Sequence, residues 1–561
     1  MNNILERILV NRGMDKDSLT ASLSQLEKPW ALLGIRDAAN IVLAAIQDKK
    51  RIIIAGDYDC DGATGTATLY RGLKMFGAEN VSFIVPDRAT MGYGLSVGLM
   101  DSIPHQEEVG LIVTVDNGIS AFDGIKYAKS KGWEVVVTDH HLGADTNPIA
   151  DAIVNPNQTG CSFPFKSTAG VGVAFYLLVA MFGILSESTS AELLPDLRTL
   201  TDLVAVGTVA DMVALESNNR ILVRYGLRRI EKGLAQEGLK ALIRHAQLNL
   251  DDGIPLTTQD IGFRIAPLIN AVGRMADMTT GIKLLTTDDP EEADILAHEL
   301  YVCNQERKKT ERGTHIEADS EILECMDGVD SHFISLYNPA WHEGIIGLVA
   351  GRIKETYKKP TAVLTKNIGG MIKGSCRSVD GVHIRDILAR VNAEHPDIMR
   401  NFGGHAMAAG LTLYNEKCIP VFESAMRNAI KTVWDGVAVD DRTTDGQLTK
   451  VDRTLSLASD IELFPWGQGV PYPIFDGLFT VVSYKLIKNN HIKFKLKDAD
   501  GSGYMDGVFF QRGGVEVVPP PKTDSQIHIR YQLIVNRFRG KSNVEAMIEK
   551  FDITKGEFDG E

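Results

Sequence analysis

Short apolar runs alternate with amphipathic stretches through the first half of the chain. Runs rich in β-branched residues predict buried strands at 51–56, 81–86, 111–115 and 134–138. Apolar positions at helical spacing predict helices at 64–76, 120–131, 170–183 and 191–210. Strands that alternate with helices are typical of a mostly parallel sheet covered by helices on both faces, so we expect an α/β fold. Residues 3–50, before the first strand, are expected to be helical.

A long polar stretch follows this region. Residues 290–326 contain a proline only at position 290 and a glycine only at position 313, and their apolar residues recur at helical spacing. This pattern predicts one connecting helix of about 55 Å. Alternating strands and helices resume over 327–440 and predict a second α/β domain.

After about residue 441 the pattern changes to short strands separated by glycine-containing turns. Five such strands predict a small β-barrel such as an OB-fold. In one of them Lys493, Lys495 and Lys497 alternate with apolar residues, which puts three lysines on one strand face. That face suits a single-stranded nucleic acid, and it is equally compatible with a merely solvated surface.

Composition adds little about function. The chain has 561 residues, of which 44% are hydrophobic and 24% charged, as in ordinary globular proteins with several domains. Its six cysteines form no CxxC pair, so we expect reduced thiols. The sequence shows neither a signal peptide nor an apolar run of about 18 residues, and a cytoplasmic location is expected. The net charge of −14 does not exclude a nucleic-acid partner, because divalent cations neutralise carboxylate-lined sites.

Acidic side chains gather where the predicted strands end. The first strand is followed by Asp57, Asp59 and Asp61, and two later strands end in Asp116 and in Asp139-His140-His141. Because ligands bind beyond the carboxyl ends of strands in α/β sheets, these side chains are expected to share one crevice. Each motif alone is also compatible with an acidic turn or a helix cap.

Asp211 adds a further acid inside an otherwise apolar run, where an unpaired carboxylate is unfavourable. Carboxylates and imidazoles without thiolates suit Mn²⁺ or Mg²⁺, and enough ligands are present for two ions. An EF-hand is excluded because Thr68 occupies the twelfth loop position. The pattern therefore predicts a two-metal hydrolytic site.

The order of these motifs resembles the DHH phosphoesterase superfamily. The resemblance rests on DYDCDG at 57–62, VDNG at 115–118, TDHH at 138–141 and GTVAD at 207–211. Further segments are similar to its RecJ branch: PDR at 86–88, GYGLS at 92–96, GRM at 273–275, WHEGIIG at 341–347, KGSCRS at 373–378, VHIRD at 382–386 and FGGHAMAAG at 402–410. The resemblance implies a DHH domain, a DHH-associated second domain and a terminal OB-fold.

The resemblance also implies an activity: 5′-to-3′ exonucleolytic hydrolysis of single-stranded DNA to 5′-mononucleotides, in DNA repair and recombination. Two Mn²⁺ or Mg²⁺ ions would be held by Asp59, Asp61, Asp116, His140 and Asp211, with Asp116 bridging and Asp57 assisting. His141 would act in catalysis, with Asp139 orienting the imidazoles. Many relatives carry a histidine where this chain has Ala55, which predicts fewer protein ligands for the first ion.

Substrate contacts are implied in the same way. Ser375 and Arg377 resemble residues that hold a 5′-terminal phosphate, and Gly404 with His405 allows close approach of a phosphate. Arg274 and Tyr93 complete the expected substrate-binding set. From pattern alone, surface ion pairs are the favoured explanation of these arginines, and a glycine-rich helix contact is the favoured explanation of 403–410.

The implied organisation is an N-terminal helical segment (1–50), a DHH catalytic domain (51–287), a connecting helix (288–326), a DHH-associated domain (327–440) and an OB-fold domain (441–561). Expected partners are single-stranded DNA, a single-strand-binding protein and a helicase; we expect a monomer without membrane contact. Two alternatives stay open: a DHH phosphodiesterase for short oligonucleotides or cyclic dinucleotides, and a non-catalytic single-strand DNA-binding scaffold.

Overall fold

The computed structural model describes residues 3–14, 22–88, 91–105, 107–248, 250, 254–325, 332–367, 369–436, 443–511, 518–538 and 541–553. The chain divides into two compact units. The first comprises Met1–Asn304, Asp452–Pro473 and Ile534–Asn543, and the second comprises Gln305–Val451, Ile474–Leu533 and Val544–Glu561.

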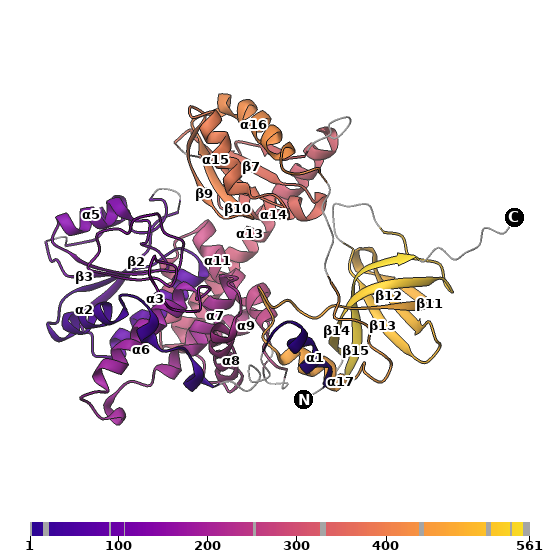
Figure 1. Ribbon diagram of the computed structural model, residues 1–561, viewed down its shortest axis with the longest axis horizontal. Coiled ribbons are helices and arrows are strands. Elements are labelled where there is room, and N and C mark those ends of the chain that lie inside the picture. The colour runs from indigo at the N-terminus through magenta and orange to yellow at the C-terminus, as the bar shows by residue number, and fades with distance from the viewer. Residues whose placement is uncertain are drawn as a thin grey trace. The chain divides into compact units, whose positions relative to one another are not determined.

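The first unit is built on a five-stranded sheet of order β2-β1-β3-β4-β5, in which all neighbouring strands are parallel (Figure 1). The strands are β1 (Ile52–Ala55), β2 (Val81–Ile84), β3 (Leu111–Val115), β4 (Glu134–Thr138) and β5 (Ala152–Val154). The predicted parallel α/β sheet is therefore confirmed. The apolar pattern missed β5 because it is only three residues long.

Helices cover both faces of this sheet, because alternate strand residues point to opposite sides. One face carries Ile52, Ile54 and Val113 and packs against α2 (Ile35–Gln47) and α6 (Gly170–Leu185). The other face carries Ile53, Ile112 and Val135 and packs against α4 (Val97–Asp101) and α5 (Phe122–Ser130). Strands buried on both faces explain the continuous apolar runs in the sequence.

The segment before β1 contains α1 (Asn3–Asn11), two short 3₁₀ turns (Leu23–Gln25 and Pro29–Ala31) and α2. Among the described residues, no single helix has the length and apolar character needed to cross a membrane. The stretches Leu23–Ala31 and Ile35–Gln47 meet that test only as a pair, bent by 91°.

A helical region follows the sheet: α7 (Thr201–Ala210), α8 (Ser217–Glu231), α9 (Glu237–His245), α10 (Thr258–Asp260), a π-helical turn (Ile261–Ile265), α11 (Ala266–Met275) and α12 (Thr279–Thr286). The predicted helix at 191–210 is wrong in its first half, which forms the 3₁₀ turns Ala191–Leu193 and Leu197–Leu200. Pro195 explains the break, because a proline ring interrupts helical hydrogen bonding.

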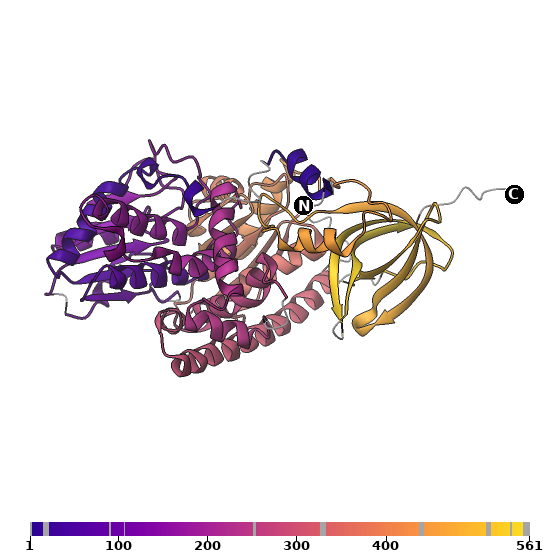
Figure 2. The same ribbon diagram turned by 90° about the horizontal axis from the view of Figure 1, so that it is seen from below.

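The predicted connecting helix is α13 (Pro290–Cys325), and Figure 2 shows it as one continuous element. Its 36 residues correspond to about 54 Å. Residues up to Asn304 belong to the first unit and residues from Gln305 onward to the second. In the second unit, the buried carboxylate of Glu311 is paired with Arg307 at 2.7 Å and with Arg352 at 2.5 Å.

The second unit contains a mixed sheet of order β6-β7-β8-β10-β9. Its strands are β6 (Ile334–Tyr337), β7 (Thr361–Lys366), β8 (Ile372–Arg377), β9 (Met399–Gly404) and β10 (Ala408–Leu413), and α14 (Ile346–Tyr357), α15 (Ile384–Glu394) and α16 (Ile419–Lys431) accompany them. The glycine-rich stretch 403–410 belongs to the β9–β10 hairpin, so a glycine-rich helix contact is excluded.

A closed five-stranded barrel of order β11-β12-β13-β15-β14 confirms the predicted OB-like domain (Figure 1). Its strands are β11 (Phe475–Ile487), β12 (His491–Asp498), β13 (Tyr504–Phe509), β14 (Gln526–Phe538) and β15 (Lys541–Ile553). The segment before the barrel contains α17 (Leu455–Leu463) and belongs to the first unit.

Candidate active site

The parallel strands deliver their acidic residues to one edge of the sheet. Ala55 pairs with Thr114, and Thr114 pairs with Val137, so β1, β3 and β4 end side by side. Asp116 follows β3 in the left-handed conformation, with φ of 63°, and its N–H donates to the carbonyl of Thr138. Such a backbone is uncommon outside glycine and is found at functional sites, where the surrounding structure enforces it.

Asn117 ties the strand ends together, a role that the sequence pattern did not reveal. Its Nδ2 donates to the carbonyls of Ala55 at 3.0 Å and Val115 at 2.9 Å. Its Oδ1 accepts the N–H of Leu95 at 3.1 Å. The side chain is fully buried, so it holds β1 and β3 in register beside Asp116.

The acidic turn after β1 continues directly into helix α3 (Cys60–Met75). Asp59 caps this helix by accepting the N–H of Gly62 at 3.0 Å. Asp61 lies in the first turn and accepts the N–H groups of Gly170 at 2.6 Å and Val171 at 2.9 Å. These two donors form the N-terminus of α6, where the helix dipole favours a carboxylate. Sequence reasoning missed this contact because more than a hundred residues separate its partners.

Three groups of candidate ligands overlap at this edge. Within each group the ligand atoms lie within 4.8 Å of one another. The groups are Asp57-Asp59-Asp116, Asp116-His140-His141 and Asp61-His140-Asp211. Nε2 of His140 lies 3.0 Å from Asp116 Oδ1, 3.6 Å from Asp211 Oδ2 and 3.9 Å from Asp61 Oδ2. The structure thus brings together all six metal-ligand candidates from the sequence.

The fit of this site to metal ions can be judged from its unsatisfied atoms. Within the described part of the chain, no side chain or backbone group donates a hydrogen bond to the buried Asp57 Oδ1 or Asp211 Oδ2. Buried oxygens without donors are rare and need an explanation such as an ion. A Cβ on Gly170 would lie 2.6 Å from the Cβ of Asp116, so only glycine permits this close packing. The donor set fits hard or borderline divalent cations.

Electrostatics without ions are unfavourable here. Burial, together with repulsion between the carboxylates, raises the pKa of Asp57, Asp61 and Asp116 well above the usual value. Burial and the charge of Asp59 raise the pKa of Asp211 to about 7. Divalent cations would remove this conflict by favouring the charged carboxylates.

Asp139 has surroundings unlike those of the other acids. Its carboxylate accepts the N–H groups of Ile119 at 2.9 Å, His140 at 2.7 Å and His141 at 3.1 Å. Nδ1 of His141 lies 2.8 Å from Asp139 Oδ1. Although burial opposes both charges, this contact lowers the pKa of Asp139 and raises that of His141 to about 9. Asp139 therefore orients the imidazole of His141.

Tyr93 lies against the same histidine. Its hydroxyl donates to the carbonyl of Asp116 at 2.9 Å and lies 3.2 Å from Nδ1 of His141. The ring packs edge-on against both Tyr58 and His141, and the Arg88 guanidinium lies 4.9 Å from the ring centre of Tyr58. Burial and the nearby carboxylates raise the pKa of the Tyr93 hydroxyl, which keeps it protonated.

Helix α11 positions Arg274 near the acidic turn. Asn270 accepts the N–H of Cys60 at 2.9 Å. A Cβ on Gly273 would lie 1.7 Å from the carbonyl of Tyr58, so the helix backbone touches the turn there. Arg274 follows directly, and its positive charge acts on Tyr58. Gly273 and Arg274 belong to the sequence motif at 273–275, whereas no pattern in the sequence points to Asn270.

The remaining candidates gather on the sheet of the second unit. Arg377 Nη1 donates to Ser375 Oγ at 3.0 Å, and both residues lie on β8. Gly404 has φ of 139°, and the N–H of His405 donates to the carbonyl of Ala408. Ala408 is the partner of Arg377 across the β8–β10 pair. Ser375, Arg377, Gly404 and His405 are thus brought together on adjacent strands.

A glycine provides the room beside these side chains. A Cβ on Gly347, in the first turn of α14, would lie 2.9 Å from Arg377 Nη2 and 3.0 Å from Ser375 Oγ. The helix N-terminus, a guanidinium and a hydroxyl therefore face one position. This combination suits a phosphate group.

On the barrel, Lys493 and Lys495 are exposed and Lys497 is half-buried, whereas Ile492, Phe494 and Leu496 face the interior. Lys493 lies 3.0 Å from Glu545, so part of its charge is neutralised within the barrel. The cationic face is therefore weaker than three free lysines would make it.

Comparison with known proteins identifies the same three regions. Family models match as the DHH family N-terminal domain at 51–208, the DHHA1 domain at 330–432 and the RecJ OB domain at 444–550. The family models cover narrower ranges than the domains expected from the sequence, so the domain boundaries themselves stay predictions.

The chain is 39% identical to the single-stranded-DNA-specific exonuclease RecJ of Escherichia coli, over 97% of this chain and 95% of that protein. It is 32% identical to RecJ of Bacillus subtilis, over 97% of this chain and 67% of that protein. RecJ of Thermus thermophilus, solved in complex with Mn²⁺, superimposes with a TM-score of 0.80 at 29% identity, covering 99% of this chain and 76% of that one. The chain belongs to the RecJ family of single-stranded-DNA-specific exonucleases.

Proposed function

We propose that this protein is a metal-dependent exonuclease that degrades single-stranded DNA from its 5′ end and releases 5′-mononucleotides. The observation that carries this proposal is the overlap of three ligand groups on Asp116 and His140, in a chain that is 39% identical to a RecJ exonuclease. Overlapping groups suit two neighbouring ions better than one. We include in the proposal a role in DNA repair and recombination and a cytoplasmic location.

Mn²⁺ or Mg²⁺ would occupy the site, and RecJ of Thermus thermophilus has been solved with each of them. Asp57, Asp59 and Asp116 would hold one ion, and Asp61, His140 and Asp211 the other. The two sets meet where His140 Nε2 lies 3.0 Å from Asp116 Oδ1. Bound ions supply a nucleophilic water and stabilise the leaving oxygen in phosphodiester hydrolysis. Ala55 supplies no ligand atom, which favours a lower affinity for the ion held by Asp57 and Asp59.

His141 holds a proton beside this centre. Asp139 occupies its Nδ1, so Nε2 is the nitrogen available to hold or release a proton at the scissile phosphate. The Tyr93 hydroxyl, anchored on the carbonyl of Asp116, lies 3.2 Å from Nδ1 and 3.4 Å from Nε2 of this ring. In the metal-free protein the contact with Asp139 raises the pKa of His141 to about 9, so the imidazole is protonated there at neutral pH.

The second unit would recognise the 5′ terminus. Arg377 and Ser375 would bind the terminal phosphate, with the backbone at Gly404 and the His405 side chain completing the contact. Arg274 would contact a further phosphate near the metal centre. We propose no more specific role for the barrel than contact with single-stranded DNA, and we propose that the protein acts as a monomer, with a single-strand-binding protein and a helicase as partners.

The deciding experiment uses one single-stranded oligonucleotide, labelled separately at each end, with Mn²⁺, with Mg²⁺ and with chelator. We expect metal-dependent release of mononucleotides from the 5′ end, and no release by Asp116→Ala. Cleavage restricted to very short oligonucleotides would instead support the small-substrate phosphodiesterase. Binding without cleavage under every metal would support the scaffold.

A further inference from the structure

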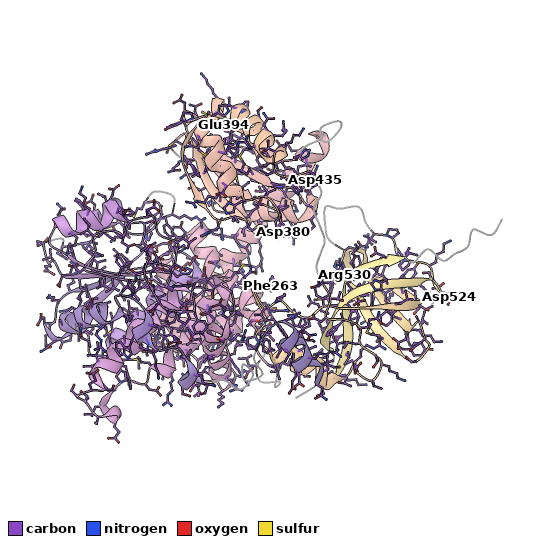
Figure 3. The ribbon with its side chains drawn as sticks, in the orientation of Figure 1. Phe263, Asp380, Glu394, Asp435, Asp524 and Arg530 are labelled. Carbon is purple, nitrogen blue, oxygen red and sulfur yellow. The ribbon has the colours of Figure 1, made fainter. Side chains whose placement is uncertain are left out.

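One aromatic side chain projects from the helical part of the first unit. Phe263 is 81% exposed, the highest exposed fraction of any large apolar side chain that the structure describes. Figure 3 labels it at the surface of this unit. Exposure on this scale is unfavourable for a phenyl ring in water, and a binding partner that covers the ring would remove this cost.

The local backbone explains why the ring points outward. Phe263 lies in the π-helical turn Ile261–Ile265, between α10 and α11. Pro267 has no N–H to donate to the carbonyl four residues earlier, which belongs to Phe263, and the wider turn accommodates this loss. Ile261 and Ile265 on the same turn are fully buried. The turn is thus anchored in the core on one side and presents Phe263 on the other. Single π turns within helices are frequent at functional sites.

This turn adjoins the end of α7 that carries the Asp211 ligand. A Cβ on Gly262 would meet only Val209 Cγ1, at 4.0 Å, so the surface beside Phe263 is open. The N–H of Met212 donates to the carbonyl of the same Val209 at 3.3 Å. Met212 directly follows Asp211, is 70% exposed and has φ of 61°, a conformation that is strained for a side chain of its size.

We propose that Phe263 and Met212, from two segments that meet at Val209, form an apolar platform on which a base of the single-stranded substrate stacks. This proposal rests on the proposed function, and it names a contact to the bases that the phosphate-binding residues do not supply. A base is the fitting occupant because the metal centre next to Asp211 receives the sugar-phosphate backbone of the same strand. Aromatic stacking tolerates every base, as a nuclease without sequence preference requires.

The position along the strand follows from the helix. Asn270, which contacts the acidic turn, lies seven residues after Phe263, or about 10 Å along the axis. A stacked strand rises about 3.4 Å per nucleotide, so the platform meets a base about two to four nucleotides from the scissile bond. The stacked base would keep the strand from sliding while the terminal nucleotide is removed.

The test combines an enzyme variant with a substrate variant, both used with the full chain. Single-turnover release of the first nucleotide is measured on oligonucleotides in which one abasic position is moved stepwise from the 5′ end. For the wild type we expect a loss of about 5- to 100-fold at one position near the third nucleotide and little elsewhere. Phe263→Ala should lose a similar factor on the intact strand, without further loss at that position. Phe263→Tyr should keep the wild-type pattern.

A matched control is Ile149→Ala, since Ile149 is 80% exposed and precedes β5 at the opposite edge of the sheet. In a second arm, oligonucleotides with 2-aminopurine at each position from about the second to the fourth nucleotide are bound to Asp116→Asn, and their fluorescence is measured. Quenching that disappears in Phe263→Ala supports the stacking, even if the wild type cuts nothing and the proposed function fails. Rates and quenching of Phe263→Ala equal to those of Ile149→Ala would overturn the platform.

Discussion

The backbone N–H of Leu215 donates a hydrogen bond of 2.9 Å to the carbonyl of Gln468. Leu215 lies four residues after the candidate ligand Asp211, whereas Gln468 belongs to the segment that leads into the barrel. The carbonyl of Leu215 accepts a second bond, from the buried guanidinium of Arg220 at 2.8 Å. Gly467 and Gly469 pack against Leu215 and Ala214. The segment 464–470 is therefore part of the first unit, which carries the acidic cluster.

Trp466 anchors this segment, and its loss is the first prediction. The indole is 4% exposed, its Nε1 donates to the carbonyl of Ile461, and its own carbonyl accepts from Thr258 Oγ1. Trp466→Ala should lower the free energy of unfolding by about 3–5 kcal/mol, because a large buried ring is removed. It should also weaken Mn²⁺ binding by loosening the chain after Asp211. Urea unfolding and metal titration measure both effects.

Leu463→Ala is the control for this prediction. Leu463 is 56% exposed and ends α17, so its truncation should change stability by less than about 0.5 kcal/mol. Equal metal affinity in both variants would show that the segment does not support Asp211. Because residues 452–473 belong to the first unit, a truncation near residue 445 removes part of that unit along with the barrel.

The sequence pattern predicted those features that depend on neighbouring residues. The alternation of strands and helices is local, and acids at strand ends must meet at one edge of a parallel sheet, which is why Asp116 and His140 could be assigned to one crevice. Contacts between distant segments carry no such signal. The N–H groups of Gly170 and Val171 on Asp61, and the bond between Leu215 and Gln468, depend on tertiary packing that periodicity does not encode.

The π turn at Phe263 could be predicted from the sequence only in part. Pro267 in an otherwise helical stretch signals a disturbed helix, but not the direction in which Phe263 points. The three lysines of β12 were likewise only partly predictable. Their alternation predicts the exposed face, whereas the contact of Lys493 with Glu545 depends on how the barrel closes.

Metal binding should stabilise the protein, because ions bind the folded carboxylate cluster and not the separated acids of the unfolded chain. At a Mn²⁺ concentration of about 100 times Kd we expect a gain of about 2.7 kcal/mol in the free energy of unfolding. In Asp116→Asn this gain should largely disappear, while the metal-free variant should be no less stable than the wild type, since repulsion within the cluster is relieved. Thermal melts with Mn²⁺ and with chelator provide the measurement. A full gain in the variant would remove Asp116 from the ligand set.

Stability without metal should fall as pH rises from about 4 towards 9. The folded-state pKa of Asp211 is raised to about 7 by burial and by Asp59, so this acid stays protonated when folded and ionises when unfolded. A raised pKa stabilises below the unfolded value and loses that stabilisation as pH rises through the folded value. His141, raised to about 9 by its contact with Asp139, changes stability in the same direction.

Urea unfolding in chelator at about pH 5 and about pH 8 measures this slope. Asp211→Asn should lessen the slope between those values, because the amide does not titrate, whereas the other acids of the cluster and His141 still contribute. Saturating Mn²⁺ should remove it as well, since bound cations favour the ionised carboxylates. A metal-free protein whose stability rises over this interval would contradict the assigned shifts.

Recognition of the 5′ phosphate can be tested through a glycine that touches no substrate in the proposed scheme. A Cβ on Gly347 would lie 2.9 Å from Arg377 Nη2 and 3.0 Å from Ser375 Oγ, so Gly347→Ala must displace one or both groups. Gly351→Ala, one turn later on α14, meets no atom within 4 Å and should be neutral or stabilising by about 0.5–1 kcal/mol. We expect Gly347→Ala to reduce the preference for 5′-phosphorylated over 5′-hydroxyl oligonucleotides about tenfold, because misplacing a bidentate guanidinium costs about 1.4 kcal/mol or more. Gly351→Ala should keep this preference.

The cleavage rates on the two substrates give this ratio directly. An unchanged ratio in Gly347→Ala would mean that Arg377 and Ser375 do not read the terminal phosphate, since the substitution acts on these two side chains and leaves the metal ligands untouched.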